Sequence, residues 1–329
     1  MQSFILKSTS SKSLQELETI QTLWSGYGKI VRYELTGGVV PSVIIKQIQL
    51  ASTSNHPRGW NSSISHDRKV KSYEVESNWY KQFNVQCDND CRTPKCYGIT
   101  HEGDTVIIVL EDLDSSGFPV RKTQVNMTEI KACLHWLANF HGCFMTVKPE
   151  GLWPIGTYWH LATRPEELAV LDDIKLKSAA PTIDKLLNES TFQTVVHGDA
   201  KLANFCFSSN TSDDKPSVAA VDFQYAGGGC GMKDVAYFLG SCLNDNECET
   251  HEQELLNYYF EALKASIIKR EKTIDTERLE EEWRTLFPVA WTDFHRFLKG
   301  WSPGHWKLTS YSERMAQEVM KQIDQKTKN

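Results

Sequence analysis

The spacing of apolar and polar positions divides the chain into a strand-rich first part and a helical second part. Short apolar runs separated by glycine turns predict three strands between Trp24 and Lys46, and two further strands ending at Leu110. A short helix is predicted ahead of them over 14–23. From Met127 onward apolar residues recur every three or four positions, which is typical of amphipathic helices. We therefore expect a small sheet followed by a mostly helical region.

Several segments can be predicted individually. Apolar periodicity predicts helices over 234–242 and 252–268, and a pair of helices over 279–297 that is divided at Pro288. Residues 51–67 are rich in Ser, Asn, Pro and Gly, and this composition predicts a mobile insertion before the next helix.

The composition is that of an ordinary globular protein. Of the 329 residues, 40% are hydrophobic and 24% are charged, and the length suffices for two lobes. The formal net charge of −6 disfavours nucleic acid as a partner, because phosphate backbones are bound by concentrated Lys and Arg. Residues 1–12 lack the apolar core of a signal peptide, and no run approaches the roughly 18 apolar residues of a membrane span. We expect a cytoplasmic protein with no membrane partner.

The nine cysteines are expected to be reduced, because disulfide frameworks belong to small secreted chains. Cys87, Cys91, Cys96 and His101 are residue types that bind zinc, but their spacing does not match a standard finger or knuckle. The sequence therefore does not decide whether this cluster binds a metal.

Two short motifs carry the most specific chemical signal in the chain. Residues 197–204 read His-Gly-Asp-Ala-Lys-Leu-Ala-Asn and follow a short apolar strand predicted at 194–196. Residues 222–224 read Asp-Phe-Gln and follow another predicted strand at 218–221. Both motifs are therefore expected at strand ends that face one cleft.

These motifs contain the groups that ATP-dependent phosphoryl transfer requires. The reaction needs a carboxylate to accept the hydroxyl proton and oxygen ligands for magnesium. Asp199 suits the first role, and Asn204 with Asp222 suits the second. Lys201 is placed to reach the transferring phosphoryl group as a point charge. An isolated His-Gly-Asp would also fit an ordinary turn. The presence of Asn204 and Asp222 at the expected distances after it indicates a kinase.

This constellation resembles the protein-kinase-like superfamily, and specifically its small-molecule branch of aminoglycoside, choline and ecdysteroid kinase-like phosphotransferases. Protein kinases usually carry Arg between the His and Asp of this loop, whereas the small-molecule branch usually carries Gly, as at Gly198. Asp-Phe-Gln at 222–224 replaces Asp-Phe-Gly in the way ecdysteroid kinase-like sequences do. Only residues 223–233 separate Asp222 from Asp234, which is too short for the usual peptide platform and favours a small-molecule acceptor.

The resemblance implies an α+β protein with a two-lobed protein-kinase-like fold. Residues 1–112 would form an N-lobe with a five-stranded antiparallel sheet and one helix. Residues 113–329 would form a mostly helical C-lobe that carries the catalytic loop 197–204, the metal motif 222–224 and the acceptor site. ATP and Mg²⁺ are the implied cofactors, and the implied partner is a small molecule with a hydroxyl group.

The resemblance also implies an ion pair in the N-lobe. Lys46 ends an apolar strand and matches the family's phosphate-gripping lysine, whose partner is expected on the next helix. We choose Glu76, because family members place this acid four residues before an aromatic residue that matches Tyr80. Glu74 is the alternative partner.

Two further segments complete the implied nucleotide site. A glycine turn is predicted to cover the phosphates, since glycines let backbone amides approach nucleotide oxygens, although a plain hairpin turn fits it nearly as well. This turn comprises Ser25, Gly26, Tyr27 and Gly28. Glu111, Asp112 and Leu113 resemble the hinge between lobes, where adenine would pair with main-chain groups.

The remaining candidate residues support the loop or contact the acceptor. His197 belongs to the catalytic loop, and Asp234 resembles the family's acid that holds this loop by backbone hydrogen bonds. Asp293 and His295 are candidate acceptor contacts. Aromatic residues of the helical part suit an apolar ring system or a quaternary amine, so choline, aminoglycoside, sterol and sugar acceptors all stay open.

Two other classes of function are retained as alternatives. One is a catalytically inactive pseudokinase that acts as a nucleotide-binding or interaction scaffold, and the joint presence of Lys46, Asp199, Asn204 and Asp222 argues against it. The other is a protein kinase, which Gly198 and the short segment after the metal motif disfavour. No obligate protein partner is inferred.

Overall fold

The computed structural model describes most of the chain. Its described residues are 1–23, 26–50, 63–209 and 216–328. Most of the predicted insertion 51–67 lies outside these residues, and the part from Ser63 onward begins helix α2 instead of belonging to a loop.

Packing divides the chain into two compact units. The first unit comprises Met1–Arg121 together with Cys206–Gln224, and the second comprises Lys122–Phe205 together with Tyr225–Asn329. The hinge segment and the metal motif thus belong to the first unit, whereas the catalytic loop belongs to the second. The predicted lobe boundary between residues 112 and 113 stays a prediction.

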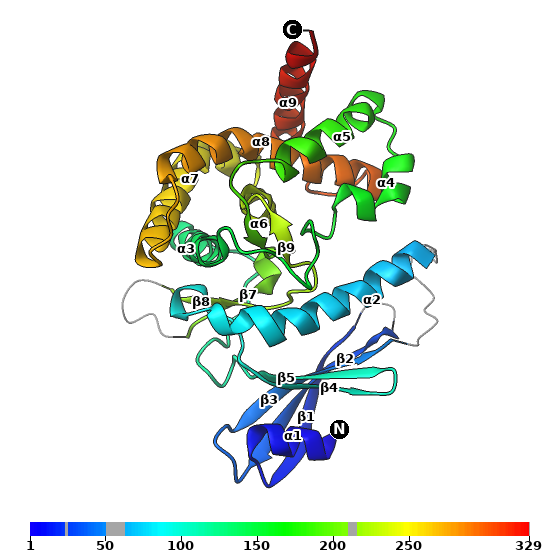
Figure 1. Ribbon diagram of the computed structural model, residues 1–329, viewed down its shortest axis with the longest axis vertical. Coiled ribbons are helices and arrows are strands. Elements are labelled where there is room, and N and C mark those ends of the chain that lie inside the picture. Colours follow the sequence, from blue (N-terminus) through cyan, green and yellow to red (C-terminus); the bar gives the residue numbers. More distant parts are fainter. Residues whose placement is uncertain (24–25, 51–62, 210–215, 329) are drawn as a thin grey trace. The chain divides into compact units, whose positions relative to one another are not determined.

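The first unit is built on a five-stranded antiparallel sheet with the order β1-β2-β3-β5-β4, which confirms the predicted sheet (Figure 1). The strands are β1 (Ser13–Thr22), β2 (Gly28–Thr36), β3 (Ser42–Gln49), β4 (Cys96–Glu102) and β5 (Thr105–Glu111). Val43 and Ile45 of β3 join Ile5 of α1 (Gln2–Thr9) in a buried cluster. Because side chains alternate along a strand, Lys46 points to the opposite face of the sheet.

The rest of the first unit follows β3 and returns after residue 205. Helix α2 (Ser63–Asn78) runs into a π-helical turn over Trp79–Phe83. Two short 3₁₀ turns then lead to β4. The returning segment forms a two-stranded ribbon from β7 (Phe205–Phe207) and β8 (Val218–Ala220).

The second unit is mostly helical, as predicted (Figure 1). Its helices are α3 (Met127–Phe144), α4 (Pro165–Ala169), α5 (Ile174–Asn188), α6 (Met232–Cys242), α7 (Asp245–Lys269), α8 (Thr276–Trp301) and α9 (Ser310–Lys328). Helix α3 packs on α7, and α8 packs on α5, α6 and α9. A small ribbon pairs β6 (Thr194–Val196) with β9 (Gly227–Gly229), and it delivers the catalytic loop. None of the described helices is long and apolar enough to cross a bilayer.

Two predictions about individual elements are wrong. Residues 14–22 of the predicted helix 14–23 belong to strand β1. Three strands were predicted between Trp24 and Lys46, but among the described residues only β2 and the first part of β3 lie there, and β1, which pairs with β2, comes before Trp24. Leu14, Leu17 and Ile20 recur at helical spacing, yet Leu17 and Ile20 stay 51% and 46% exposed, so pairing with β2 decides the conformation. The predicted pair of helices at 279–297 is one helix.

Pro288 lies inside the continuous helix α8. Proline removes one helical hydrogen bond and normally ends or kinks a helix. Apolar residues on both sides of it, including Trp283, Phe287 and Trp291, are buried. The packing of these side chains in the second unit offsets the lost hydrogen bond, so the helix stays continuous through Pro288.

Candidate active site

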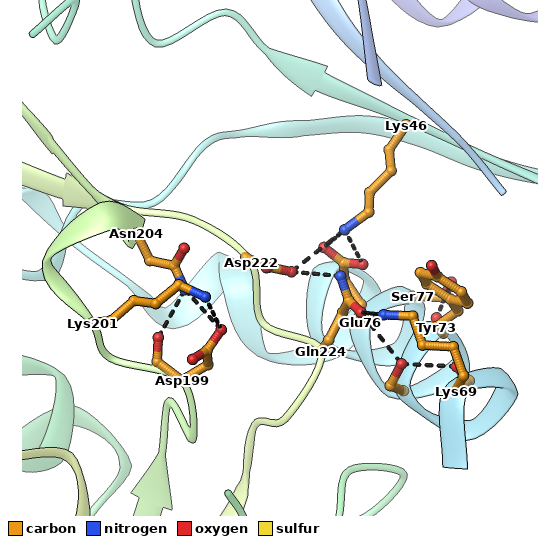
Figure 2. Close-up of polar contacts among 11 residues, drawn as sticks. Lys46, Lys69, Tyr73, Glu76, Ser77, Asp199, Lys201, Asn204, Asp222 and Gln224 are labelled. Carbon is orange, nitrogen blue, oxygen red and sulfur yellow. Dashed lines mark hydrogen bonds and ion pairs between the residues drawn. The ribbon is translucent and has the colours of Figure 1, made fainter. Parts of the chain in front are cut away.

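An ion pair between Lys46 and Glu76 lies between the sheet and α2 of the first unit (Figure 2). Lys46 Nζ is 2.6 Å from Glu76 Oε2 and 2.7 Å from Oε1, and both side chains are buried. Glu74, the alternative partner, is exposed and pairs with Lys71 at 3.1 Å. The structure therefore brings together the two residues chosen from the sequence.

The surroundings of Lys46 keep its ammonium charged. Burial disfavours the charge, but Glu76 and Asp222 raise the pKa of Lys46 above its ordinary value. Asp222 Oδ1 lies 3.5 Å from Lys46 Nζ. A charged ammonium fixed between two acids is suited to bind a phosphate group.

Glu76→Gln should lower the free energy of unfolding by about 3 kcal/mol, because it removes the main counter-charge of a buried ammonium. Glu74→Gln is the matched control, and its exposed pair with Lys71 should change stability by less than about 0.5 kcal/mol. Urea denaturation of the three proteins measures both values. Equal losses in the two variants would contradict the choice of Glu76 as the partner.

Asp222 is tied to α2 through Gln224. Gln224 Nε2 donates to Asp222 Oδ1 at 2.6 Å, and its Oε1 accepts from Lys69 Nζ at 2.8 Å and from Ser72 Oγ at 3.3 Å (Figure 2). The backbone of Asp222 has a φ of +71°, a conformation that Asp and Asn adopt more readily than most residues. Its side chain keeps 35% of its surface exposed. Gln224 thus fixes the direction of a carboxylate that a ligand can reach.

Phe223 anchors the same motif in the core of the first unit. Its ring is fully buried and stacks on Trp79, with ring centroids 4.3 Å apart. Tyr80 contacts the ring edge-on at 6.2 Å. The residues on both sides of Phe223 are therefore held by packing as well as by hydrogen bonds.

The acids of the predicted hinge are used within the first unit. Glu111 pairs with Arg92 at 2.5 Å and accepts from the Lys95 amide at 2.9 Å. Asp112 Oδ2 lies 3.0 Å from Arg32 Nε and accepts from Ser42 Oγ at 2.7 Å. Both acids therefore have partners within the protein, and the pairing of adenine with main-chain groups of this segment stays a prediction.

The glycine turn between β1 and β2 is partly described, since Ser25 lies outside the described residues. A Cβ at Gly28 would lie 1.9 Å from the Gln47 carbonyl oxygen, and φ there is +134°, so the position requires glycine. Tyr27 is buried, and its hydroxyl lies 2.5 Å from His66 Nδ1. The phosphate-binding role of Ser25, Gly26, Tyr27 and Gly28 stays a prediction.

The catalytic loop of the second unit is organised around Asp199. Asp199 Oδ2 accepts from Lys201 Nζ at 3.0 Å and from Asn204 Nδ2 at 3.2 Å (Figure 2). Asp199 Oδ1 accepts from the Tyr237 hydroxyl at 3.1 Å. Asn204 Nδ2 also donates to the Asp199 carbonyl at 2.7 Å, which leaves Asn204 Oδ1 as the oxygen to face a metal. Tyr237 was missed by the sequence analysis, because no motif marks it.

Asp234, in the first turn of α6, binds the backbone at the start of this loop. Its fully buried carboxylate accepts the amide of His197 at 2.6 Å and the amide of Gly198 at 2.9 Å. His141 Nε2 lies 3.1 Å from the same carboxylate, and its Nδ1 lies 2.8 Å from the Tyr259 hydroxyl. The geometry is that of a support for the loop backbone, as the resemblance implied.

The two candidate acceptor contacts have internal partners in the second unit. Asp293 accepts from Trp159 Nε1 at 3.0 Å and pairs with Arg296 at 2.8 Å. His295 lies 3.0 Å from Ser312 Oγ, and burial lowers the pKa of its imidazole. Both side chains are buried. Their contact with an acceptor stays a prediction.

The nine cysteines form no disulfide among the described residues, and they do not build a metal site there. Across the described part of the chain, no three His, Cys, Asp or Glu residues gather in a way that could hold a metal ion, and this includes Cys87, Cys91, Cys96 and His101.

The antiparallel sheet with its Lys46–Glu76 pair and the helical unit with its Asp199 loop define a protein of the kinase-like superfamily, in its small-molecule branch. The model of the ecdysteroid kinase-like family matches residues 62–151 and 171–272, which is more than half of the chain. The chain belongs to the ecdysteroid kinase-like family. This confirms the resemblance to small-molecule kinases that was inferred from Gly198 and the Asp-Phe-Gln motif.

Comparison with solved structures finds several small-molecule kinases and phosphotransferases at low sequence identity. A microcompartment-associated aminopropanol kinase is 12% identical, with 96% of this chain and 94% of that chain covered and a TM-score of 0.49. A putative fructosamine-3-kinase from Haemophilus somnus 129PT is 12% identical, with coverages of 98% and 96% and a TM-score of 0.48. An aminoglycoside-3'-phosphotransferase of type VIII is 13% identical, with coverages of 88% and 98% and a TM-score of 0.45. No curated protein matches the chain.

Proposed function

We propose that this protein transfers the γ-phosphate of ATP to a hydroxyl group of a small organic molecule, in a reaction that depends on Mg²⁺. The observation that carries the proposal is the Asp199 carboxylate, which Lys201, Asn204 and Tyr237 hold in one orientation. Membership of a kinase-like family supports the same reaction class. The short segment 223–233 favours a small acceptor over a peptide.

Asp199 would receive the proton of the acceptor hydroxyl. As the hydroxyl oxygen bonds to the γ-phosphorus, the bond from that phosphorus to the β–γ bridging oxygen breaks and ADP leaves. The proton passes to an oxygen of Asp199, whose direction is set by its three side-chain partners. Lys201 would offset negative charge on the transferring group, because its ammonium is already beside Asp199 and its side chain is 40% exposed.

The chain offers oxygen atoms that suit magnesium. Asp222 is a partly exposed carboxylate, and Asn204 has its amide nitrogen committed to Asp199, so that its oxygen is the atom for a cation. Mg²⁺ prefers such oxygen ligands and, when bound, neutralises charge on the phosphates. Lys46, kept charged by Glu76 and Asp222, would hold phosphate oxygens. We further propose that the protein acts in the cytoplasm.

Asp222→Asn should abolish Mg²⁺-dependent phosphate transfer, because it removes the charged metal ligand while keeping the side-chain shape. Asn is preferred to Ala here, since Asn tolerates the positive φ of residue 222. The assay measures ADP formation and phosphorylated product with a panel of hydroxyl metabolites. Wild-type transfer to a panel member is the expected result.

The same assay separates the alternative functions. A pseudokinase would bind ATP and transfer phosphate to none of the compounds, and a protein kinase would label only peptides. Asp104→Asn, in an exposed turn between β4 and β5, is the matched control and should leave activity unchanged. Full activity of Asp222→Asn would overturn the metal assignment.

A further inference from the structure

Lys307 lies in the loop between α8 and α9 and places its ammonium against three aromatic rings of the second unit. Its Nζ is 4.6 Å from the centroid of the Tyr237 ring, 5.4 Å from that of Trp306 and 5.5 Å from that of Phe294. Such distances are those of cation–π contacts. Tyr237 and Phe294 are buried, whereas Trp306 is 66% exposed. The Lys307 ammonium thus occupies an aromatic surface of the kind that binds cationic ligands, so a cationic ligand would have to compete with it.

This ammonium has no acidic partner among the described residues, where no carboxylate oxygen comes within 4.0 Å of Lys307 Nζ. Asp199 is the acid with the largest effect on its charge, and Tyr237 links the two residues because its ring contacts Lys307 and its hydroxyl donates to Asp199. Burial lowers the pKa of Lys307 to about 8, against the opposing effect of Asp199. Lys307 is therefore mainly cationic at neutral pH.

A half-buried ammonium without a counter-ion favours the approach of an anion. Removal from water costs free energy, and a ligand with a negative group recovers part of it. A cationic ligand near Asp199 would instead be repelled by two positive charges, those of Lys307 and Lys201. The other polar candidates of this unit, Asp293 and His295, are occupied by internal partners.

We propose that Lys307 determines the specificity of the acceptor site by binding an anionic group of the acceptor, while the exposed ring of Trp306 contacts its apolar part. The proposal deepens the proposed function and rests on it, since it takes the surroundings of Asp199 as the acceptor site. A carboxylate, sulfate or phosphate group shares the required chemistry. Choline-like and aminoglycoside-like acceptors are disfavoured, because both carry positive charge.

The test compares ligands that differ only in charge. The probes are 4-(hydroxymethyl)benzoate, 1,4-benzenedimethanol and 4-(aminomethyl)benzyl alcohol, and 4-(hydroxymethyl)phenyl phosphate distinguishes phosphate from carboxylate. Calorimetric titration of the full chain, with excess ADP and Mg²⁺ present, keeps the probes away from the nucleotide-binding residues. We expect the better of the two anions to bind at least tenfold more tightly than the amine at pH 7.

Two substitutions assign the preference to Lys307. Lys307→Met should remove the tenfold preference and leave the affinity of the neutral diol within about twofold, because it deletes the charge and keeps the apolar stem. Lys307→Arg should retain the preference, and thermal unfolding of all three proteins checks that they are folded. Equal affinities for anion and amine, tighter binding of the amine, or no binding of any probe would overturn the proposal.

The pH dependence adds a second readout. Because Lys307 loses its proton as the pH rises through its pKa of about 8, the tighter binding of the anion relative to the neutral diol should be present at pH 7 and largely lost by pH 9.5. The charged and titratable groups around Lys307 are Asp199, Lys201, Cys242 and Tyr237. Burial raises the pKa of the Cys242 thiol and that of the Tyr237 hydroxyl, so that both stay neutral. A preference that persists in Lys307→Met would contradict the assignment. Failure of the proposed function is distinct, since it would appear as absent phosphate transfer with charge preference intact.

Discussion

Asp199→Asn should lower turnover by about 10³-fold while ATP affinity and thermal stability stay near the wild-type values. A group that receives the acceptor proton acts mainly in the transition state, and general-base groups of this kind contribute about 10²- to 10⁴-fold. Asn keeps the size of the side chain and can still accept from Tyr237, so the loop should remain in place. Calorimetric ATP titration with Mg²⁺, run alongside turnover on a hydroxyl compound from the panel, measures both quantities.

The control for this variant is Asp172→Asn, which alters an exposed acid of the same unit and should change neither quantity. Three results are informative. Full turnover in Asp199→Asn would refute the role of proton acceptor. Loss of ATP binding together with loss of stability would make Asp199 a structural residue. A wild-type protein that binds ATP and transfers no phosphate would be a scaffold.

Asp234→Ala should remove both stability and activity. The fully buried carboxylate accepts two loop amides and lies beside His141, so its loss leaves the amides of His197 and Gly198 without their acceptor. Buried groups that lose a charged hydrogen-bond partner cost about 1–3 kcal/mol each, and we expect a total loss of about 3 kcal/mol or more in the free energy of unfolding. Denaturant unfolding measures this loss, and turnover should fall with it.

Asp234 and Asp199 are therefore expected to have different roles, the first structural and the second catalytic. Asp234→Ala should change stability and activity together, whereas Asp199→Asn should change activity alone. Glu249→Ala, in an exposed part of α7, serves as the control for a general effect of losing an acid. Unchanged stability in Asp234→Ala would show that water replaces the carboxylate, and would contradict its supporting role.

The fold could be predicted where local pattern and packing agree. Asn126 caps the N-terminus of helix α3 through a capping box with Glu129, and the apolar period of the helix matches its buried face. Strand β1 could not be predicted, because Leu14, Leu17 and Ile20 repeat at helical spacing on a segment that is mostly exposed. Its conformation depends on hydrogen bonds to β2, which sequence spacing does not encode.

Some residues of the candidate site could likewise be predicted from the sequence, whereas others could not. Asp199, Asn204 and Asp222 are found from short-range spacing, and Glu76 from its distance to an aromatic residue. Tyr237 and Lys307 lie at no characteristic sequence distance from these motifs. Tyr237 reaches Asp199 from a helix 38 positions further along the chain, and Lys307 reaches Tyr237 from a loop. Only the packing of α6 and α8 brings these groups near the catalytic loop.

The backbone at Gly198 limits how this loop can change over evolutionary time. A Cβ at this position would lie 2.1 Å from the Tyr225 carbonyl oxygen and 2.8 Å from the Thr157 amide nitrogen, and φ there is +78°. Arginine, which protein kinases usually carry at this point, cannot occupy it unless both neighbouring segments move. In this chain, an arginine at residue 198 would therefore need matching shifts of the segments around Thr157 and Tyr225, so a substitution at this position alone cannot give the protein-kinase loop.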